Sequence, residues 1–482
     1  MLRKENIINK ILKTIPAFQN KTKKFFQYFI EALRGSERDL TETKLGFAIF
    51  FLSVPMVLEM IMESLFAIVD IYFVSKLGSA ATATVGLTES MITIIYAVNA
   101  GLSAATVAIV SRRIGEKKHD DAAVAAFQAI VLSVVVSIFF TIIGIFFSEK
   151  LLGLMGASED VIKEGSKFTA IMLGGNITIV MLFVINAIFR SAGDAAISMR
   201  ALWLANGLNI ILDPCFIFGW WIFPEMGVAG AAVATNIGRG VAVAYQLYML
   251  FKGGKHIQIK LIHFKIRFKI IKNMVKLSMG GIGQSLIATI SWLAMIRMLS
   301  VFGKDVVAGY TIAIRVIIFL LLPSWGLSNA AATLVGQNLG ANRPDRAEKV
   351  AWITGFINFG FLGIISIFTI WFAPEIIRFF TNDEALIIAG IKSLRIVSLG
   401  FIGYGFGMVI MQSFNGAGNT KTPTLINLLW FWCIEIPLAY FLSMHTPLNE
   451  NGVYWAIVIA EVLLALHGII LFKKGDWKLQ KV

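Results

Sequence analysis

Twelve apolar runs, each about the length of a membrane-spanning helix, divide this chain of 482 residues. A transmembrane helix needs about 20 predominantly apolar residues. The chain is 57% hydrophobic and 15% charged, whereas a soluble domain is about a quarter charged. The runs lie roughly at 46–73, 83–111, 121–147, 166–189, 196–220, 227–251, 271–297, 305–335, 348–373, 386–414, 422–443 and 453–472. We therefore predict an all-α integral membrane protein with twelve transmembrane helices.

The connections between these runs alternate in positive charge. Basic residues gather after the second, fourth, sixth, eighth, tenth and twelfth runs, and the other connections hold one or two or none. Because short cytoplasmic loops carry the excess of Lys and Arg, both termini are predicted to be cytoplasmic, as an even number of spans requires. The net charge of +14 is thus a topology signal in a multi-pass membrane protein, and no nucleic-acid partner is expected.

The second half of the chain repeats the first at an offset of 225 residues. The offset relates VSRRIGEKKHDDA at 110 to VGQNLGANRPDRA at 335, RSAGD at 190 to NGAGN at 415, and GVAGAAVA at 227 to GVYWAIVI at 452. Six is an even number, so two six-helix units have the same orientation. We predict two six-helix lobes related by a pseudo-two-fold axis along the membrane normal, with a cavity between them.

These patterns divide the chain into five segments. Residues 1–44 are Lys-rich and form a cytoplasmic arm, which is either amphipathic on the membrane surface or disordered. The two lobes occupy residues 45–251 and 271–472, a basic cytoplasmic linker covers 252–270, and residues 473–482 form a cytoplasmic tail.

The first apolar run carries three carboxylates, although the stretch 55–78 is long enough to span a bilayer. Glu59, Glu63 and Asp70 are spaced by four and seven residues, which puts them on one stripe of a helix. A charge at bilayer depth costs at least about 2.5–3.5 kcal/mol, so this stripe must face a cavity or the protein interior. For the two glutamates, a neutral, hydrogen-bonded structural role is an equal alternative.

A second polar stripe lies in the fifth and sixth runs. Asn206, Asn209 and Asp213 share one helix face, and Thr235 follows in the next run at a similar depth. Two carboxylates, an amide and a hydroxyl suit a small hard cation, or protons held on coupled carboxylates. The alternative is a buried polar network that only holds the helices together.

The second half lacks these acids. The positions equivalent to Asp70 and Asp213 hold Met295 and Leu438, so the asymmetry favours a cation site in the first lobe. The second half instead carries charges within its own runs: Glu435, Arg297 and Arg315. Glu435 with either arginine could form a buried ion pair, or these charges could face a substrate.

The sequence resembles the prokaryotic branch of the multidrug and toxic compound extrusion (MATE) family over about residues 46–472. The matching motifs are ESLFAIVDIYFVSKLG, RRIGE, GQNLGA, FRSAGD, FNGAGN, NIILDP and GAAVAT. The resemblance implies a V-shaped pair of six-helix lobes. It also implies export of cationic or amphipathic small molecules in exchange for H⁺ or Na⁺, with no other cofactor.

The resemblance also implies roles for individual residues. The cation-coupling site, which is a possible Na⁺ site, would be formed by Asp70, Asn209, Asp213 and Thr235. Asn186 and Glu63 match positions that line the same cavity, although relatives often have Gln where Glu63 stands. The full set of predicted cavity or substrate residues is Glu63, Asn186, Asn206, Arg297, Arg315 and Glu435. The resemblance also implies that the protein lies in a bacterial inner membrane, and we expect a monomer in the lipid bilayer.

Two other functions compete with an antiporter. A flippase for a lipid-linked precursor would use a related two-lobe fold, and would need several cationic residues to hold a diphosphate. A membrane-embedded enzyme would need a nucleophile with its base or a metal site, and the scattered histidines have no metal-ligand spacing. We therefore predict that the protein is not an enzyme.

Overall fold

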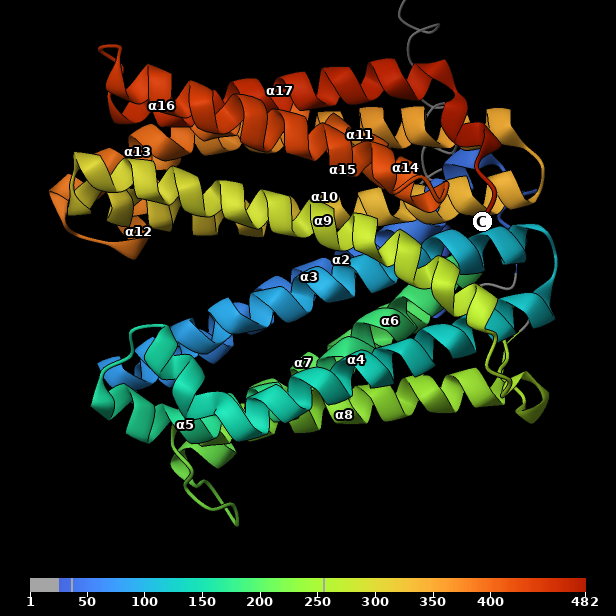
Figure 1. Cartoon of the computed structure of the whole chain (residues 1–482), viewed down its shortest axis with the longest axis horizontal. Coiled ribbons are helices and arrows are strands. Elements are labelled where there is room, and N and C mark those ends of the chain that lie inside the picture. Colours follow the sequence, from blue (N-terminus) through green and yellow to red (C-terminus); the bar gives the residue numbers. More distant parts are fainter. Residues whose placement is uncertain (1–25, 36–37, 255) are drawn as a thin grey trace, which may run out of the picture.

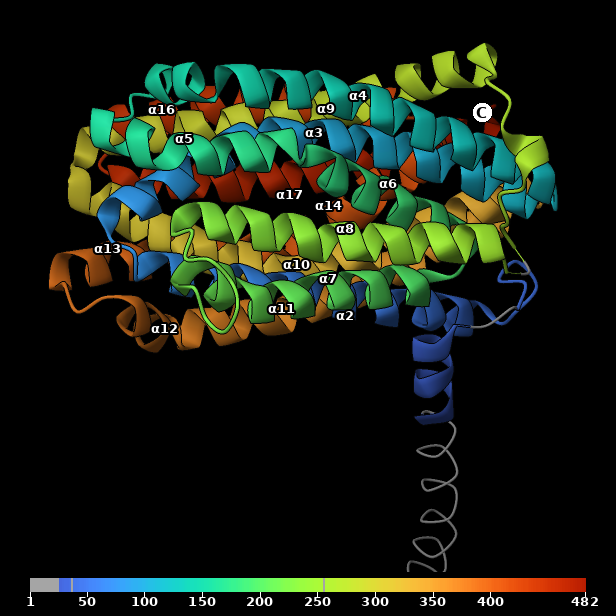
Figure 2. The same cartoon turned by 90° about the horizontal axis from the view of Figure 1, so that it is seen from below.

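The computed structural model describes residues 26–35, 38–254 and 256–482, and all regular elements in these ranges are helices. Most of the predicted arm therefore lies outside the described residues, although residues 26–34 are helical. Figure 2 shows this short helix projecting across the direction of the spans. Its placement on a membrane surface stays a prediction.

The first lobe contains six spans. Its helices are α2 (Leu45–Ser75), α3 (Ser79–Gly115), α4 (His119–Leu154), α5 (Glu159–Gly174), α6 (Asn176–Ala192), α7 (Ala195–Phe218) and α8 (Val228–Lys252). Helices α5 and α6 together form one span. The short 3₁₀ helix η1 (Leu261–His263) lies in the linker that follows.

The second lobe repeats this order. Its elements are α9 (Phe268–Leu299), η2 (Ser300–Phe302), α10 (Lys304–Gly340), α11 (Pro344–Trp371), α12 (Ala373–Phe380), α13 (Glu384–Leu399), α14 (Phe401–Gly416), α15 (Lys421–Asn427), the π-helix η3 (Leu428–Glu435), α16 (Ile436–Met444) and α17 (Glu450–Lys474). A 3₁₀ turn, η4 (Asp476–Leu479), ends the chain.

The number of spans agrees with the sequence. Among the described residues, ten helical segments are long and apolar enough to cross a membrane, and α13 with α14 forms an eleventh that is bent by 52°. Helix α8, with 25 residues, completes the twelve; it carries Arg239 at its centre, which lowers its apolar character. The prediction of an all-α protein with twelve spans in two lobes is confirmed.

The two lobes approach each other at one end of the bundle. In Figure 1 the ribbons of α2–α8 and of α10–α17 lie close together where the C-terminus is placed, and they diverge toward the opposite end. The first of these ends carries Lys117 and Lys118 between α3 and α4, and Arg343 between α10 and α11. We call it the basic end.

Reciprocal glycine contacts explain how close the lobes come at the basic end. A Cβ added to Gly115 of α3 would lie 1.9 Å from the Gln337 carbonyl oxygen, and one added to Gly340 of α10 would lie 2.1 Å from the Arg112 carbonyl oxygen. Gly115 and Gly340 are 225 residues apart, as are Arg112 and Gln337. The same contact is therefore made twice, as a pseudo-two-fold axis requires.

The first helix of each lobe also contributes to the core of the other lobe. Ile49 and Leu52 of α2 belong to a buried cluster formed mainly by α10, α11, α14 and α17. Their repeat equivalents, Met274 and Leu277 of α9, belong to the buried cluster formed by α3, α4 and α6. The start of each helix thus packs against the opposite lobe.

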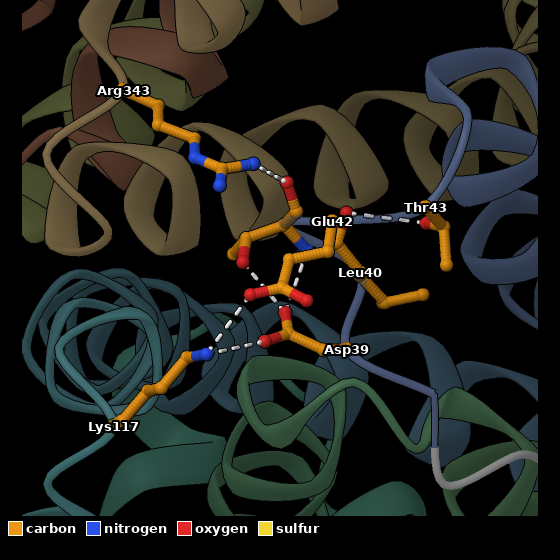
Figure 3. Close-up of polar contacts among 7 residues, drawn as sticks. Asp39, Leu40, Glu42, Thr43, Lys117 and Arg343 are labelled. Carbon is orange, nitrogen blue, oxygen red and sulfur yellow. Dashed lines mark hydrogen bonds and ion pairs between the residues drawn. The ribbon is translucent and has the colours of Figure 1, made fainter.

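A short segment before α2 joins the two lobes at the basic end (Figure 3). Lys117 Nζ of the first lobe lies 3.4 Å from Asp39 Oδ2 and 3.0 Å from Glu42 Oε1. From the second lobe, Arg343 Nη1 donates a hydrogen bond of 2.7 Å to the Thr41 carbonyl oxygen. We call residues 38–44 the bridging segment.

The chain end makes a second connection at the basic end. Trp477 of η4 is fully buried in the second lobe and stacks on Phe472 with ring centroids 4.4 Å apart. From the first lobe, Arg112 Nη2 donates 3.0 Å to the Gln480 carbonyl oxygen, and Arg113 Nη2 donates 3.1 Å to a Val482 oxygen. Both ends of the described chain therefore hold the lobes together on this side.

Candidate functional site

The four residues of the predicted cation-coupling site lie together in the first lobe. Asn209 of α7 donates through Nδ2 to Asp213 Oδ1 at 3.1 Å and to Thr235 Oγ1 of α8 at 2.9 Å. Asp70 of α2 completes the group, because its carboxyl lies close enough to Asp213 for the two to interact. Helix geometry explains this, since Asn209 and Asp213 are one turn apart and α7 packs against both α2 and α8.

Burial makes this group chemically unusual. Asp213 is fully buried, and Asn209 and Thr235 are nearly so. Asp213 Oδ2 and Asn209 Oδ1 are both buried, and neither accepts a hydrogen bond from an amide, hydroxyl or guanidinium group of a described residue. Buried polar atoms are almost always paired, so two unpaired acceptor oxygens beside a second carboxyl indicate a site for a cation or a proton.

Glu63 and Asn206 form a separate contact next to this site. Asn206 Nδ2 donates a hydrogen bond of 3.1 Å to Glu63 Oε2, which joins α7 to α2. Arg239 of α8 is buried nearby, where its Nη2 donates 3.4 Å to the Tyr96 hydroxyl oxygen and its charge interacts with Glu63 and Asp70. A fixed positive charge therefore partly balances the carboxylates of this lobe.

Asn186 belongs to a different cluster from the one expected. Its Nδ2 donates 3.0 Å to Glu59 Oε1, and its Oδ1 accepts a short hydrogen bond from Gln246. The structure thus groups Asn186 with the first acid of the α2 stripe and not with Asp213. Each acid of that stripe has its own set of partners.

The three charged residues predicted for the second lobe, Glu435, Arg297 and Arg315, form no ion pair with one another in the described part of the chain. Glu435 is buried, and its Oε2 accepts a hydrogen bond of 2.8 Å from Ser291 Oγ. Arg297 is exposed and its Nη1 donates 3.4 Å to Ser300 Oγ, whereas Arg315 is an exposed residue of α10. Among the described residues Glu435 forms no ion pair, so that alternative is wrong for this structure.

One acidic residue near the site was not predicted from the sequence. Glu89 of α3 has an exposed side chain whose charge interacts with Asp70 in its own lobe and with Arg315 of the second lobe. It lies near the start of its apolar run, where a charged residue usually marks a helix end. Only the approach of α10 distinguishes Glu89 from such a residue, and no pattern in the sequence indicates that contact.

The two-lobe fold and its buried carboxylates define a multi-pass membrane transporter. The model of the MatE family matches residues 55–215 and 282–441, and the chain belongs to this family, the MATE transporters.

Relatives and solved structures agree with this assignment. The probable multidrug resistance protein NorM of Thermotoga maritima is 26% identical, with 89% of this chain and 93% of NorM covered. The multidrug export protein MepA of Staphylococcus aureus strain N315 is 22% identical, over 88% of this chain and 92% of MepA.

Two solved structures match nearly the whole fold. A MATE transporter crystallised in complex with MaL6 has a TM-score of 0.86 and 28% identity, covering 92% of this chain and 99% of its own. A MOP superfamily transporter from Pyrococcus furiosus also has a TM-score of 0.86, with 27% identity and coverage of 92% and 98%.

Proposed function

We propose that this protein is a secondary active antiporter that exports cationic or amphipathic small molecules in exchange for H⁺ or Na⁺. The observation that carries the proposal is the buried group of Asp70, Asn209, Asp213 and Thr235, with two unpaired acceptor oxygens. The names of relatives such as NorM and MepA, which refer to multidrug resistance and export, support the choice of substrate class.

The structure suggests how the cation would be coupled to transport. The basic end is taken as cytoplasmic, in agreement with the distribution of Lys and Arg. The lobes meet at this end and diverge at the other (Figure 1), which fits a state that faces the outside. A monovalent cation that enters from outside would cancel one negative charge of the Asp70 and Asp213 pair, so part of the charge that disfavours closure of this face would be removed.

Acidic residues around the site favour a cationic substrate. Glu63 and Glu89 interact electrostatically with Arg239 or with Asp70, so the first lobe presents more negative than positive charge here. The flippase alternative needs a cluster of cationic residues. Arg239 is buried and donates to Tyr96, and the charge of Arg315 is opposed by Glu89 across the lobes, so the two arginines do not form a cationic cluster of the kind that a diphosphate needs.

The test uses purified protein in proteoliposomes loaded with a cationic dye. Asp70→Asn and Asp213→Asn are each expected to reduce dye efflux at least about tenfold, because the amide binds neither a proton nor a metal cation as a carboxylate does. Asp160→Asn, at an exposed position of α5, is the matched control. Efflux at the wild-type rate in both site variants would refute the proposal.

The same vesicles identify the coupling ion. A pH gradient imposed without sodium, and a sodium gradient imposed at equal pH, are compared for the wild-type protein. Efflux driven by one gradient and not by the other assigns the ion, and efflux that neither gradient drives contradicts antiport by H⁺ or Na⁺.

A further inference from the structure

A second buried polar cluster lies closer to the basic end than the Asp70 site. It consists of four side chains from α2, α6 and α8: Glu59, Asn186, Arg190 and Gln246. Glu59 is 1% exposed and Arg190 9% exposed, and Arg190 is two residues from the end of α6 at this side. The network therefore lies inside the lobe but near its basic end.

The hydrogen bond and the ion pair of Glu59 both involve the same one of its oxygens. Glu59 Oε1 accepts from Asn186 Nδ2 at 3.0 Å and lies 3.4 Å from Arg190 Nη2. Glu59 Oε2 is buried and has no hydrogen-bond partner among the described residues, and the same holds for Gln246 Oε1. A buried ion pair with a purely structural role is stable only when its remaining hydrogen-bonding positions are satisfied, and these two are not.

The unpaired atoms are both acceptors, so they require a donor or a positive charge. A metal cation is disfavoured because the Arg190 guanidinium already lies against the only carboxylate of the cluster and would repel it. No group of three or more His, Cys, Asp or Glu side chains arranged to hold a metal ion occurs in the described part of the chain. A proton needs a single oxygen, and Glu59 Oε2 provides it.

The position of Glu59 connects it to the proposed coupling site. Glu59 and Glu63 are four residues apart and therefore neighbours on the α2 surface, and Asp70 follows about two turns later on the same stripe. The charged groups that interact with Glu59 from the packed elements are Arg190 of α6 and Glu63 of α2. Carboxyl groups thus extend along α2 from Asp70 toward the basic end.

We propose that Glu59 is a proton-accepting residue that lies on the release path from the Asp70 site to the cytoplasm. A proton leaves the Asp70 and Asp213 carboxyl pair, passes by way of Glu63, and binds Glu59 Oε2. The neutral Glu59 no longer balances Arg190, so the contact between α2 and α6 weakens until the proton leaves at the basic end. This inference rests on the proposed antiport, in its proton-coupled form.

The experiment compares two transport modes of full-length protein in proteoliposomes. One mode is dye accumulation driven by a pH gradient, and the other is exchange of dye for dye without a gradient. We expect Glu59→Gln to reduce the driven mode at least about tenfold while exchange stays within about twofold of wild type. Glu59→Asp, which keeps the carboxyl, is expected to recover at least about a third of the driven rate.

Outcomes that overturn the inference are distinct from failure of the proposed function. Wild-type driven transport in Glu59→Gln overturns it, as does an equal loss of both modes with a lowered melting temperature, which is the result of a structural role. Sodium-driven transport that is wild-type in rate and independent of pH also overturns it. If Asp70→Asn and Asp213→Asn both keep wild-type driven transport, the proposed function itself fails. Glu164→Gln, at an exposed position of α5, is the control.

Discussion

The glycine contacts between α3 and α10 lead to a quantitative prediction about conformation. A Cβ on Gly115 would lie 1.9 Å from a carbonyl oxygen, whereas real Cβ atoms essentially never come within 3.0 Å of such an atom. Backbone cannot rotate away as a side chain can, so the helices must separate by roughly 1 Å at this point. Overpacking of this kind typically costs about 1–3 kcal/mol.

This overpacking destabilises only the state in which the basic end is closed. If the protein also adopts a state in which the lobes part at the basic end, Gly115→Ala should shift the equilibrium toward it by about 5- to 150-fold. Gly340→Ala should act in the same direction, because the repeat places Gly340 in the equivalent contact. Gly86→Ala, in the same helix as Gly115 but with open space around its Cα, is the matched control.

The assay measures the distance between the lobes at the basic end by spin-label spectroscopy. Labels are attached to Asp121→Cys in α4 and Lys349→Cys in α11, both exposed positions. Cys433 is exposed and is first replaced by Ser, whereas Cys215 is buried and stays. We expect a longer distance in Gly115→Ala and Gly340→Ala. A distance distribution identical to that of Gly86→Ala would refute the idea that these contacts restrain the basic end.

Two further predictions concern the connections at the basic end. Partial burial of Asp39 raises its pKa, but hydrogen bonds within its turn and the contact with Lys117 outweigh this and leave the pKa below the ordinary value of 3.8. The stabilisation by ionised Asp39 is therefore lost only below about pH 4. Asp39→Asn should thus leave the dependence of the efflux rate on pH unchanged between pH 5 and 8. A changed pH dependence in this range would contradict this. Trp477→Ala should lower the melting temperature in detergent, because truncating a buried Trp costs about 3–5 kcal/mol. Trp221 is 82% exposed, so Trp221→Ala should leave the melting temperature unchanged. Equal melting temperatures for the two variants would refute the role of the Trp477–Phe472 stack.

The sequence predicted the features that depend on spacing along one helix or on the repeat. The stripe of Glu59, Glu63 and Asp70 follows from helical periodicity, and the equivalent glycines follow from the offset of 225 residues. Because carboxylates are costly in a membrane, their clustering was itself a sign of a buried site.

Contacts between distant helices could not be predicted in this way. The partner of Arg239 is Tyr96, which lies 143 residues earlier and carries no charge to mark it. Glu435 was a plausible partner for Arg297, but the helix that bears Arg297 turns this side chain outward to Ser300. Rotation of one helix about its axis decides such pairings, and composition does not determine that rotation.

Local breaks in the helices were also difficult to anticipate. The tenth span bends by 52° between α13 and α14, at Gly400, which lies in an apolar run without proline. The π-helix η3 ends two residues before Pro437, whose missing N–H leaves a carbonyl one turn earlier without its usual donor. The second break had a visible cause in the sequence, whereas the first depends on tertiary packing.

The first turns of α2 and α9 each pack against the opposite lobe, and this affects whether the two halves of the chain can fold separately. Ile49 and Leu52 lie in a core formed mainly by the second half, and Met274 and Leu277 lie in a core formed mainly by the first half. If fragments 1–251 and 252–482 were produced separately, each would expose the apolar start of its first helix. The core of each fragment would also lack the helix start that the other half contributes. Two such fragments made in one cell should therefore reassemble into a working pair, much as an obligate heterodimer does.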